Sequence, residues 1–190
     1  MSALHPQTCN AQSPGRAGAQ KQRRNGGKMK ISVFRIDDRL IHGQVITAWI
    51  AYADAKTIIV ADDKAAGDEF TQSLLKMATP DSIQLKIMRV EEAISWIQTT
   101  EEAGQALLLV RSPKEALSFI DAGFRDHVIN VGNLNMKKGK TKVLGNLWVF
   151  PEDVELIKDI YGKGVKMEVR AVPNEKSQDV MELLKKSKLV

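Results

Sequence analysis

From Met29 onward, hydrophobic residues follow two alternating patterns along the chain. Short runs rich in β-branched and aliphatic residues are typical of strands buried in a sheet, and stretches with apolar residues three and four positions apart predict helices. The seven expected strands are residues 30–36, 57–61, 83–89, 105–110, 127–131, 147–150 and 165–170.

The second pattern predicts six helices that each present one apolar face. The faces are Val45, Ile46, Trp49 and Ile50; Phe70, Leu74 and Met77; Ala93, Ile94 and Ile97; Leu117 and Ile120; Val154, Ile157 and Ile160; and Val180, Leu183 and Leu184. Met77, Met88 and Met167 are expected to fill the core. Strands that alternate with helices predict an α/β fold, with an open, mainly parallel, twisted seven-stranded sheet and helices on both faces.

Charge and composition exclude several classes of function for this chain. The 190 residues carry a formal net charge of +5, and residues 1–28 alone hold five basic residues and no acid, so residues 29–190 are neutral. A neutral domain with 5% aromatic residues lacks the basic, aromatic surface of a nucleic-acid reader. No apolar run has the roughly 18 residues of a membrane span. Because Cys9 is the one cysteine, the domain is expected to have no disulfide and no zinc site.

Two regions are expected from this distribution. Residues 1–28 are poor in large apolar side chains and predict a disordered basic leader, either an extension or an artificial addition upstream of a natural start at Met29. Residues 29–190 predict a single domain. Its one long connection, residues 132–144, carries Lys137, Lys138 and Lys140, which fit either a solvated loop or a partner contact.

The densest polar cluster of the domain, residues 37–44, follows the first expected strand and reads Asp-Asp-Arg-Leu-Ile-His-Gly-Gln. Open parallel sheets bind ligands beyond the carboxyl ends of their strands, and the free amides at a helix start favour an anion. A neutral His42 can attack phosphorus while Arg39 and the amides of Gly43 and Gln44 neutralise the phosphate oxygens. A solvated loop histidine is the other interpretation of His42.

The remaining histidines are poorer candidates. His5 lies in the leader, and His127 lies at the amino end of its expected strand, at the opposite edge of the sheet from a ligand. His42 is therefore the one candidate nucleophile of this type.

Residues 35–45, Arg-Ile-Asp-Asp-Arg-Leu-Ile-His-Gly-Gln-Val, closely resemble the signature of the IIB component of the mannose/fructose/sorbose-type bacterial phosphoenolpyruvate-dependent sugar phosphotransferase system. Similar segments follow at 58–63, 130–141 and 164–170, so the resemblance extends over residues 29–190. One departure is Asn133, where a second glycine is common in the family.

The resemblance implies a seven-stranded, mainly parallel α/β fold and a phosphoryl group carried covalently on His42, with no metal or other cofactor. The IIA component would donate this group, and the sugar translocated by the membrane components IIC and IID would accept it. The chain would then be a protein-N(pi)-phosphohistidine:sugar phosphotransferase in the cytoplasm, transiently at the inner face of the membrane. The resemblance is compatible with a homodimer, and the sugar cannot be identified from the sequence.

Further polar residues are expected around this site. Asp37 is expected to fix the arginine or the imidazole tautomer, although an aspartate that caps a turn is an equally good interpretation. Asp38 is expected to be a solvated loop residue that lines the site. Asp63 follows the second expected strand, Asn130 and Gly132 lie at the carboxyl end of the fifth, and all three are expected to line the site as well.

Two other function classes stay open from the residues alone. Asp37, Asp38, Asp62 and Asp63 follow the first two strands and could hold Mg²⁺ for phosphoaspartyl chemistry. The same strand ends could instead hold an anionic small molecule in a regulatory module without catalysis. A phosphohistidine survives base and is lost in acid, whereas a phosphoaspartate is destroyed by base, so the stability of the phosphorylated protein in base distinguishes the two.

Overall fold

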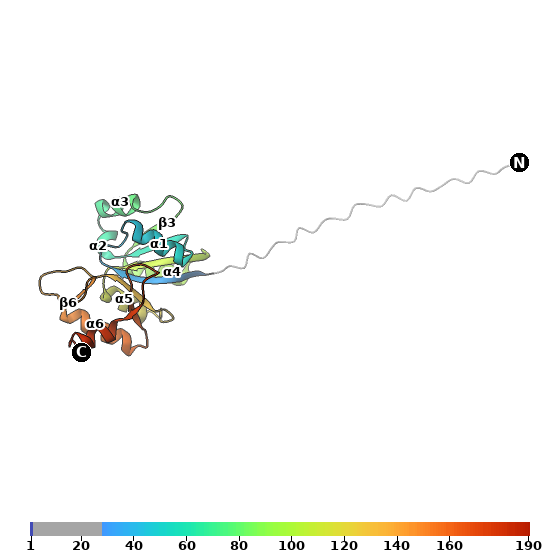
Figure 1. Cartoon of the computed structure of the whole chain (residues 1–190). Helices are drawn as coiled ribbons and strands as arrows, with labels where there is room; N and C mark the ends of the chain where they lie inside the picture. The colour runs from blue at the N-terminus through green and yellow to red at the C-terminus, as the bar shows by residue number, and fades with distance from the viewer. Residues whose placement is uncertain (2–27) are drawn as a thin grey trace.

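A seven-stranded sheet, ordered β3-β2-β4-β1-β5-β8-β9, forms the centre of the protein (Figure 1). It is described from a computed structural model that covers Met1 and residues 28–190; most of the expected leader, including His5 and Cys9, lies outside the described residues. The strands of the sheet are β1 (Met29–Asp37), β2 (Thr57–Ala61), β3 (Gln84–Met88), β4 (Gly104–Val110), β5 (Ile129–Asn133), β8 (Met167–Val169) and β9 (Gln178–Asp179).

The expected mainly parallel sheet is confirmed, since every neighbouring pair in it is parallel except β8 and β9. Strands β2 and β4 are buried on both faces, because helices cover both sides of a parallel sheet. The carboxyl ends of β1, β2, β4 and β5 therefore come together at one edge.

One expected strand belongs elsewhere. Residues 147–150 were expected in the main sheet, but β7 (Leu147–Val149) pairs antiparallel with β6 (Thr141–Leu144) in a separate hairpin. Leu147 and Val149 are buried against the core, which explains why their pattern matches that of a sheet strand. The seventh strand of the sheet is the two-residue β9, which is too short to give a pattern of its own.

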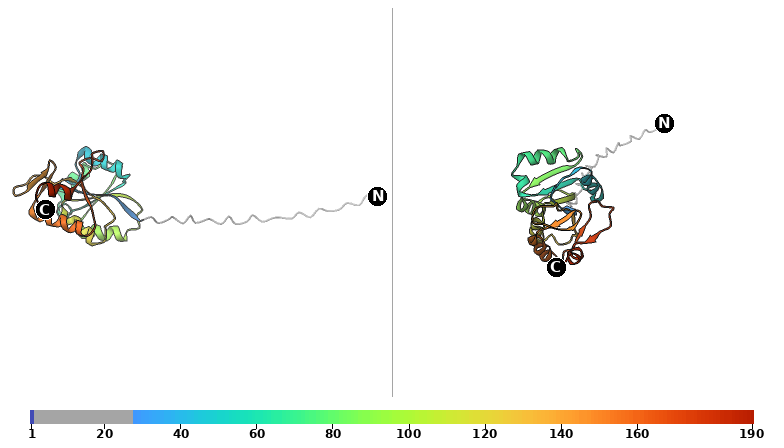
Figure 2. Two further views of the ribbon diagram at one scale, coloured as in Figure 1. Left: turned by 60° about the horizontal axis from the view of Figure 1, so that its bottom comes forward. Right: turned by 60° about the vertical axis from the view of Figure 1, so that its left-hand side comes forward.

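Seven helices pack on the two faces of the sheet (Figures 1 and 2). The helices are α1 (Gly43–Ala53), α2 (Asp63–Ala66), α3 (Glu69–Met77), α4 (Val90–Thr99), α5 (Pro113–Asp121), α6 (Pro151–Gly162) and α7 (Val180–Lys186). Buried residues of α4 to α7 form one hydrophobic cluster with the sheet, and those of α1 to α3 form a second. No helix in the described part of the chain is long and apolar enough to cross a membrane.

Helix α3 is oriented differently from the expectation. Phe70, Leu74 and Met77, which the pattern predicts as its inner face, are 72%, 50% and 84% exposed, and Leu75 is its buried residue. The interpretation of Met77 as core filler is therefore wrong. The helix lies near the edge strand β3 (Figure 1), where one side chain is enough to attach it to the core. Its periodic apolar residues consequently face outward.

Candidate functional site

The loop between β1 and α1 is anchored by two buried side chains. Leu40 and Ile41 pack into the core on the α1 side of the sheet, and Leu40 adopts a left-handed φ of 60°. This conformation is uncommon for leucine and is held by the burial of its side chain. His42 follows as the exposed N-cap residue of α1. The buried side chains of Leu40 and Ile41 thus fix the backbone that holds the His42 imidazole at the surface.

Asp37, the last residue of β1, connects two arginines. Its carboxylate is 2% exposed and accepts hydrogen bonds from Nη2 of Arg35 at 2.8 Å and from the backbone amide of Arg39 at 3.1 Å. Nε and Nη2 of Arg39 donate to the same carboxylate at 3.1 and 3.2 Å. Asp37 therefore caps the turn and also orients the Arg39 guanidinium, which remains about a third exposed (32%).

Arg35 is the buried end of this chain of contacts. Its guanidinium donates to the side-chain oxygen of Asn130 and to the carbonyl of Arg170 at 3.1 Å, and it lies 5.0 Å from the ring centroid of Trp49. Burial lowers the pKa of Arg35, although the carboxylate of Asp37 opposes this effect. Asn130 was expected to line the site, but it lies behind it and supports the arginine.

Gly132 leaves room for this arginine. A Cβ atom at position 132 would lie 1.8 Å from Cζ of Arg35, a distance that no side chain tolerates. Gly132 was also expected to line the site, and the structure instead places it against the buried guanidinium. Its contribution to the site is the space that it leaves for Arg35.

Asp38 is held by β5 and the residues that follow it. Its carboxylate accepts hydrogen bonds from Nδ2 of Asn133 at 2.7 Å and from the backbone amide and Nδ2 of Asn135 at 2.9 and 3.0 Å. Asp38 was expected to line the site, and it lies on the same cavity as His42. The interpretation of Asp38 as a solvated loop residue is wrong, because three hydrogen bonds hold its carboxylate. Asn133 is the residue at which the sequence was expected to depart from the family signature.

Arg111, the first residue after β4, joins the loop to β2. It donates from Nε and Nη2 to the carboxylate of Asp62 at 2.7 and 2.9 Å, and from Nη1 to the carbonyl of Asp38 at 2.9 Å. Burial raises the pKa of Asp62, but the hydrogen bonds from Arg111 and from the amide of Ala65 outweigh it, so the pKa lies below its ordinary value. The bond to Asp62 raises the pKa of Arg111. This pair is therefore charged at neutral pH.

The β1–α1 loop, helix α3 and Arg111 surround one open cavity of about 390 Å³ at the carboxyl edge of the sheet. Arg39, His42, Gly43 and Arg111 line it together with Leu74 of α3. The first amides of α1 have no partner within the helix, and no side chain caps them at His42. The cavity thus combines an exposed imidazole with two guanidinium groups and a helix start, which suits a phosphate group. Gln44 is the second residue of α1, so its backbone lies at the helix start beside Gly43, as expected from the sequence.

A second cavity of about 400 Å³ lies on the other side of Asp38. Asp63 lines this cavity with Lys137 and Lys140, and its carboxylate accepts a hydrogen bond from the amide of Val90 at 2.9 Å. Burial lowers the pKa of Lys140. Asp63 was expected beside the histidine, but the structure separates it from the cavity of His42.

The four aspartates of the magnesium hypothesis do not form a metal site. Asp37 is bound by arginines, Asp38 by asparagines and Asp62 by Arg111, and Asp63 accepts from a backbone amide. Within residues 28–190 and Met1, no group of three His, Cys, Asp or Glu side chains is placed to hold a metal ion. These carboxylates act as anchors for cationic and amide groups.

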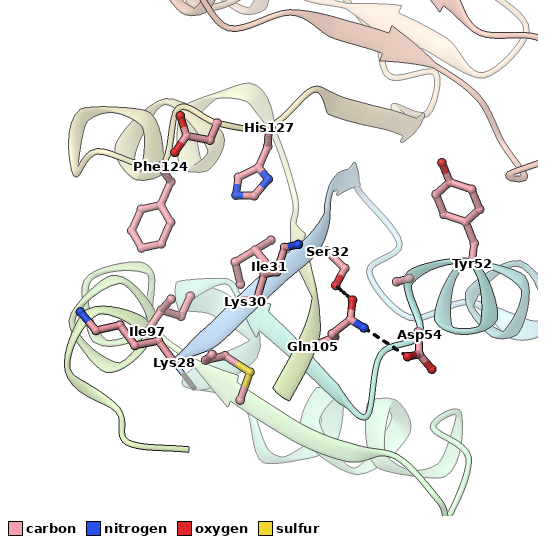
Figure 3. Close-up of a pocket in the computed structure, with 13 residues that line it drawn as sticks. Lys28, Lys30, Ile31, Ser32, Tyr52, Asp54, Ile97, Gln105, Phe124 and His127 are labelled. Carbon is pink, nitrogen blue, oxygen red and sulfur yellow. Dashed lines mark hydrogen bonds between the residues drawn. The ribbon is translucent and has the colours of Figure 1, made fainter. Parts of the chain in front are cut away.

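His127 lies at the opposite edge of the sheet, just before β5, as expected from the sequence. Figure 3 shows it on a cavity of about 750 Å³ near Lys30 and Ser32 of β1. Ser32 Oγ donates to Gln105 Oε1 at 2.6 Å, and Gln105 Nε2 donates to Asp54 at 3.1 Å across this cavity (Figure 3). Burial lowers the pKa of His127. Nothing in this surrounding resembles the two-arginine site at His42.

Sequence reasoning missed three residues that shape the site: Arg35, Arg111 and Asn135. Arg111 could have been found, because it directly follows a buried strand and the rule of carboxyl-edge binding applies to it as well as to residues 37–44. Arg35 reads as an ordinary strand residue, and Asn135 contacts Asp38 only in the folded chain.

A comparison with family models matches residues 31–190 to the PTS system sorbose subfamily IIB component. The fructose-specific EIIB component of the PTS from Bacillus subtilis (strain 168) is 31% identical over 158 residues, which cover 83% of this chain and 97% of that protein. The mannose-specific EIIAB component from Escherichia coli (strain K12) is 32% identical over 159 residues, or 83% of this chain and 49% of that protein.

The comparison with solved structures agrees. The crystal structure of the IIBSor domain of the sorbose permease from Klebsiella pneumoniae superposes with a TM-score of 0.79 at 27% identity. The match covers 84% of this chain and 98% of that domain. The residues matched by the family model, 31–190, include the helices of this structure, nearly all of its sheet and the edge at which His42 lies.

Proposed function

The chain belongs to the sorbose subfamily of PTS IIB components and is a phosphoryl-transfer component of a sugar uptake system, and from this premise we propose that His42 is the residue that carries the phosphoryl group. The observation that carries the proposal is the exposed imidazole on a cavity that it shares with Arg39 and Arg111. In residues 28–190 the other histidine, His127, has no arginine pair beside it.

The reaction consists of two displacements at phosphorus. In the first, an uncharged imidazole nitrogen of His42 forms a bond to the phosphorus carried by the IIA donor, as the bond from phosphorus to the donor side chain breaks. In the second, a hydroxyl oxygen of the sugar attacks the same phosphorus, the N–P bond breaks, and the hydroxyl proton leaves to a base or water. His42 is then regenerated as neutral imidazole. This is the activity of a protein-N(pi)-phosphohistidine:sugar phosphotransferase.

The charges around His42 support these transfers without a metal ion or other cofactor. Arg39 and Arg111, with the free amides at Gly43 and Gln44, supply positive potential where the phosphate oxygens gain charge in the transition state. Asp37 acts through Arg39 as a positioning residue, because it binds both the amide and the guanidinium of that arginine.

The partners are those that membership of the family implies. A IIA component donates the phosphoryl group, and the sugar bound by the membrane components IIC and IID accepts it, so the chain works in the cytoplasm and meets the inner face of the membrane transiently. Because donor and acceptor use the same imidazole in turn, both complexes have to dissociate quickly, as small, transient interfaces do.

The test is phosphoryl transfer from phosphoenolpyruvate through the general relay proteins and a IIA partner. We expect labelling of the wild type that survives base and is lost in acid, and no labelling of His42→Ala. Arg39→Ala is expected to lower the labelling rate roughly 100-fold, because removal of one oxyanion donor has an effect of this size. His127→Ala is the matched control and should be labelled like the wild type. Label on His42→Ala, or label of the wild type that is released by mild base, would contradict the proposal.

A further inference from the structure

Helix α3 has an apolar face that the core does not use. Phe70, Leu74 and Met77 are 72%, 50% and 84% exposed, although they follow the spacing of a buried helix face. Single exposed apolar residues are ordinary, but three large ones on one short helix form a patch of the kind that marks an interaction site. We call these three residues the α3 apolar face.

The α3 apolar face is continuous with the cavity of His42. Leu74 and Thr71 form one wall of that cavity, and His42, Arg39 and Arg111 line it from the β1–α1 loop and the end of β4. Leu74 therefore belongs both to the exposed face and to the surroundings of the imidazole.

Direct transfer to His42 requires that a protein donor cover this region. The donor has to bring its phosphorus within bonding reach of the imidazole, and a typical interface covers about 800 Å² on each partner, a disc of about 16 Å radius. Phe70 and Met77 are seven positions apart, which is about 10 Å along a helix. A donor centred on His42 thus extends over the α3 apolar face.

The chemistry of this surface suits a phosphorylated protein. Its centre holds two arginines beside the imidazole and its flank holds the apolar side chains, so it matches a partner whose phosphate is surrounded by apolar residues. The Escherichia coli relative is named as a mannose-specific EIIAB component, and this chain covers 49% of it. The name of that relative combines IIA and IIB in one chain, whereas this chain matches only about half of it. A IIA donor that is a separate protein therefore needs a docking surface on this chain.

We propose that the α3 apolar face, Phe70, Leu74 and Met77, is the surface on which the phosphorylated IIA donor docks. This inference rests on the proposed function of His42 and adds the means by which the donor is recognised. The IIA partner packs apolar side chains on Phe70 and Leu74 while its phosphate enters the cavity between Arg39 and Arg111.

The test separates docking from chemistry with two phosphate donors. The double variant Phe70→Ala/Met77→Ala, which leaves Leu74 and the cavity of His42 intact, is labelled either by phosphorylated IIA or by phosphoramidate, a small donor whose P–N bond breaks with release of ammonia as the bond to imidazole forms. We expect kcat/KM with IIA to fall about 10- to 100-fold through a higher KM, as for loss of two interface anchors, and labelling by phosphoramidate to stay unchanged. Val128→Ala is the matched control, because Val128 is 53% exposed beside His127 at the opposite edge of the sheet.

Four results would overturn the inference and leave the proposed function of His42 standing. Unchanged kinetics with IIA would show that the donor does not use the face, and a loss confined to the later transfer to sugar would assign it to the membrane acceptor. A dimer that the substitutions dissociate, measured by light scattering, would assign it to a second copy of the chain. Equal loss with phosphoramidate would show that the residues shape the site itself. If wild type is labelled by neither donor, the proposed function of His42 fails as well.

Discussion

At the scale of the residue, the central feature is the buried Arg35 guanidinium, which positions the exposed Arg39 guanidinium through Asp37. Arg35 is 1% exposed, and its hydrogen bonds go to Asn130, to a carbonyl and to Asp37, which in turn binds Arg39. Such a charge is tolerated inside a protein when it is paired with an opposite charge and hydrogen-bonded. The order of Arg39 at the site therefore depends on a residue that never reaches the surface.

Gly132→Ala tests this arrangement. The added Cβ would meet the Arg35 guanidinium at 1.8 Å and force it out of place, so we expect a loss of about 1–3 kcal/mol in unfolding free energy, measured with urea, together with slower labelling of His42. Gly145→Ala is the control, because nothing lies within 4 Å of its added Cβ, and it should change stability by less than about 0.5 kcal/mol. Equal effects of the two variants would show that Arg35 adjusts freely.

The Asp62–Arg111 pair predicts a dependence of stability on pH. The pKa of Asp62 is lower in the folded protein than in the unfolded chain, so its contribution is present above the unfolded pKa of about 4 and is lost as pH falls through the folded value. Asp62→Asn should therefore be less stable than wild type at pH 7, with a difference that narrows below about pH 4. Urea unfolding of both proteins across this range measures it, and a constant difference would contradict the assignment.

At the scale of the element, the sequence predicts what local pattern and burial determine. The expected limits of β2, residues 57–61, match the structure, because the run is buried on both faces. Helix α5 begins at a local signal of the same kind, because Ser112 caps it and Pro113 is its first residue. Strand β9 has two residues and depends on pairing with β8, so it gave no local signal. The sequence also carries no signal that shows which face of α3 is turned toward the core. Periodicity identifies an apolar face of a helix, but it does not show whether the core or solvent contacts that face.

Helix α3 provides a matched pair for stability. Leu75→Ala should cost about 2–3 kcal/mol in unfolding free energy, because Leu75 is 5% exposed and is the buried side chain of this helix. Phe70→Ala, on the same helix, should cost less than about 0.5 kcal/mol, because its side chain remains largely in water when the protein is alone. The opposite order would mean that the helix packs through the face assigned to docking.

The β1–α1 loop is the element on which His42 depends. Leu40→Ala removes a buried anchor with a φ of 60°, and we expect a loss of about 2–3 kcal/mol in stability. Labelling of His42 by phosphoramidate should also slow at a temperature where the variant is still folded, as measured by circular dichroism. A variant that is destabilised but labelled at the wild-type rate would show that the loop needs no anchor.

At the scale of the whole molecule, the fold brings long-range partners to one edge. Asn133 of β5 binds the Asp38 side chain, and Arg111, which follows β4, binds the Asp38 carbonyl. Arg111 also binds Asp62, which follows β2. The site lies where these strand ends meet the start of α1. The position of His42 at a strand end could be predicted, because the order of elements places it there. The contacts of Arg35, Arg111 and Asn135 could not be predicted from the sequence. Apart from the bond between Arg35 and Asp37, these contacts join residues that are 49 to 135 positions apart.

The most direct test of the account is to locate the phosphoryl group on the chain. The wild-type protein, phosphorylated through IIA and digested at alkaline pH, is analysed by tandem mass spectrometry. We predict a single phosphorylated residue, His42, and its complete disappearance after mild acid. A phosphoryl group found on Asp37, Asp38, Asp62 or His127 instead, with His42 unmodified, would contradict the account.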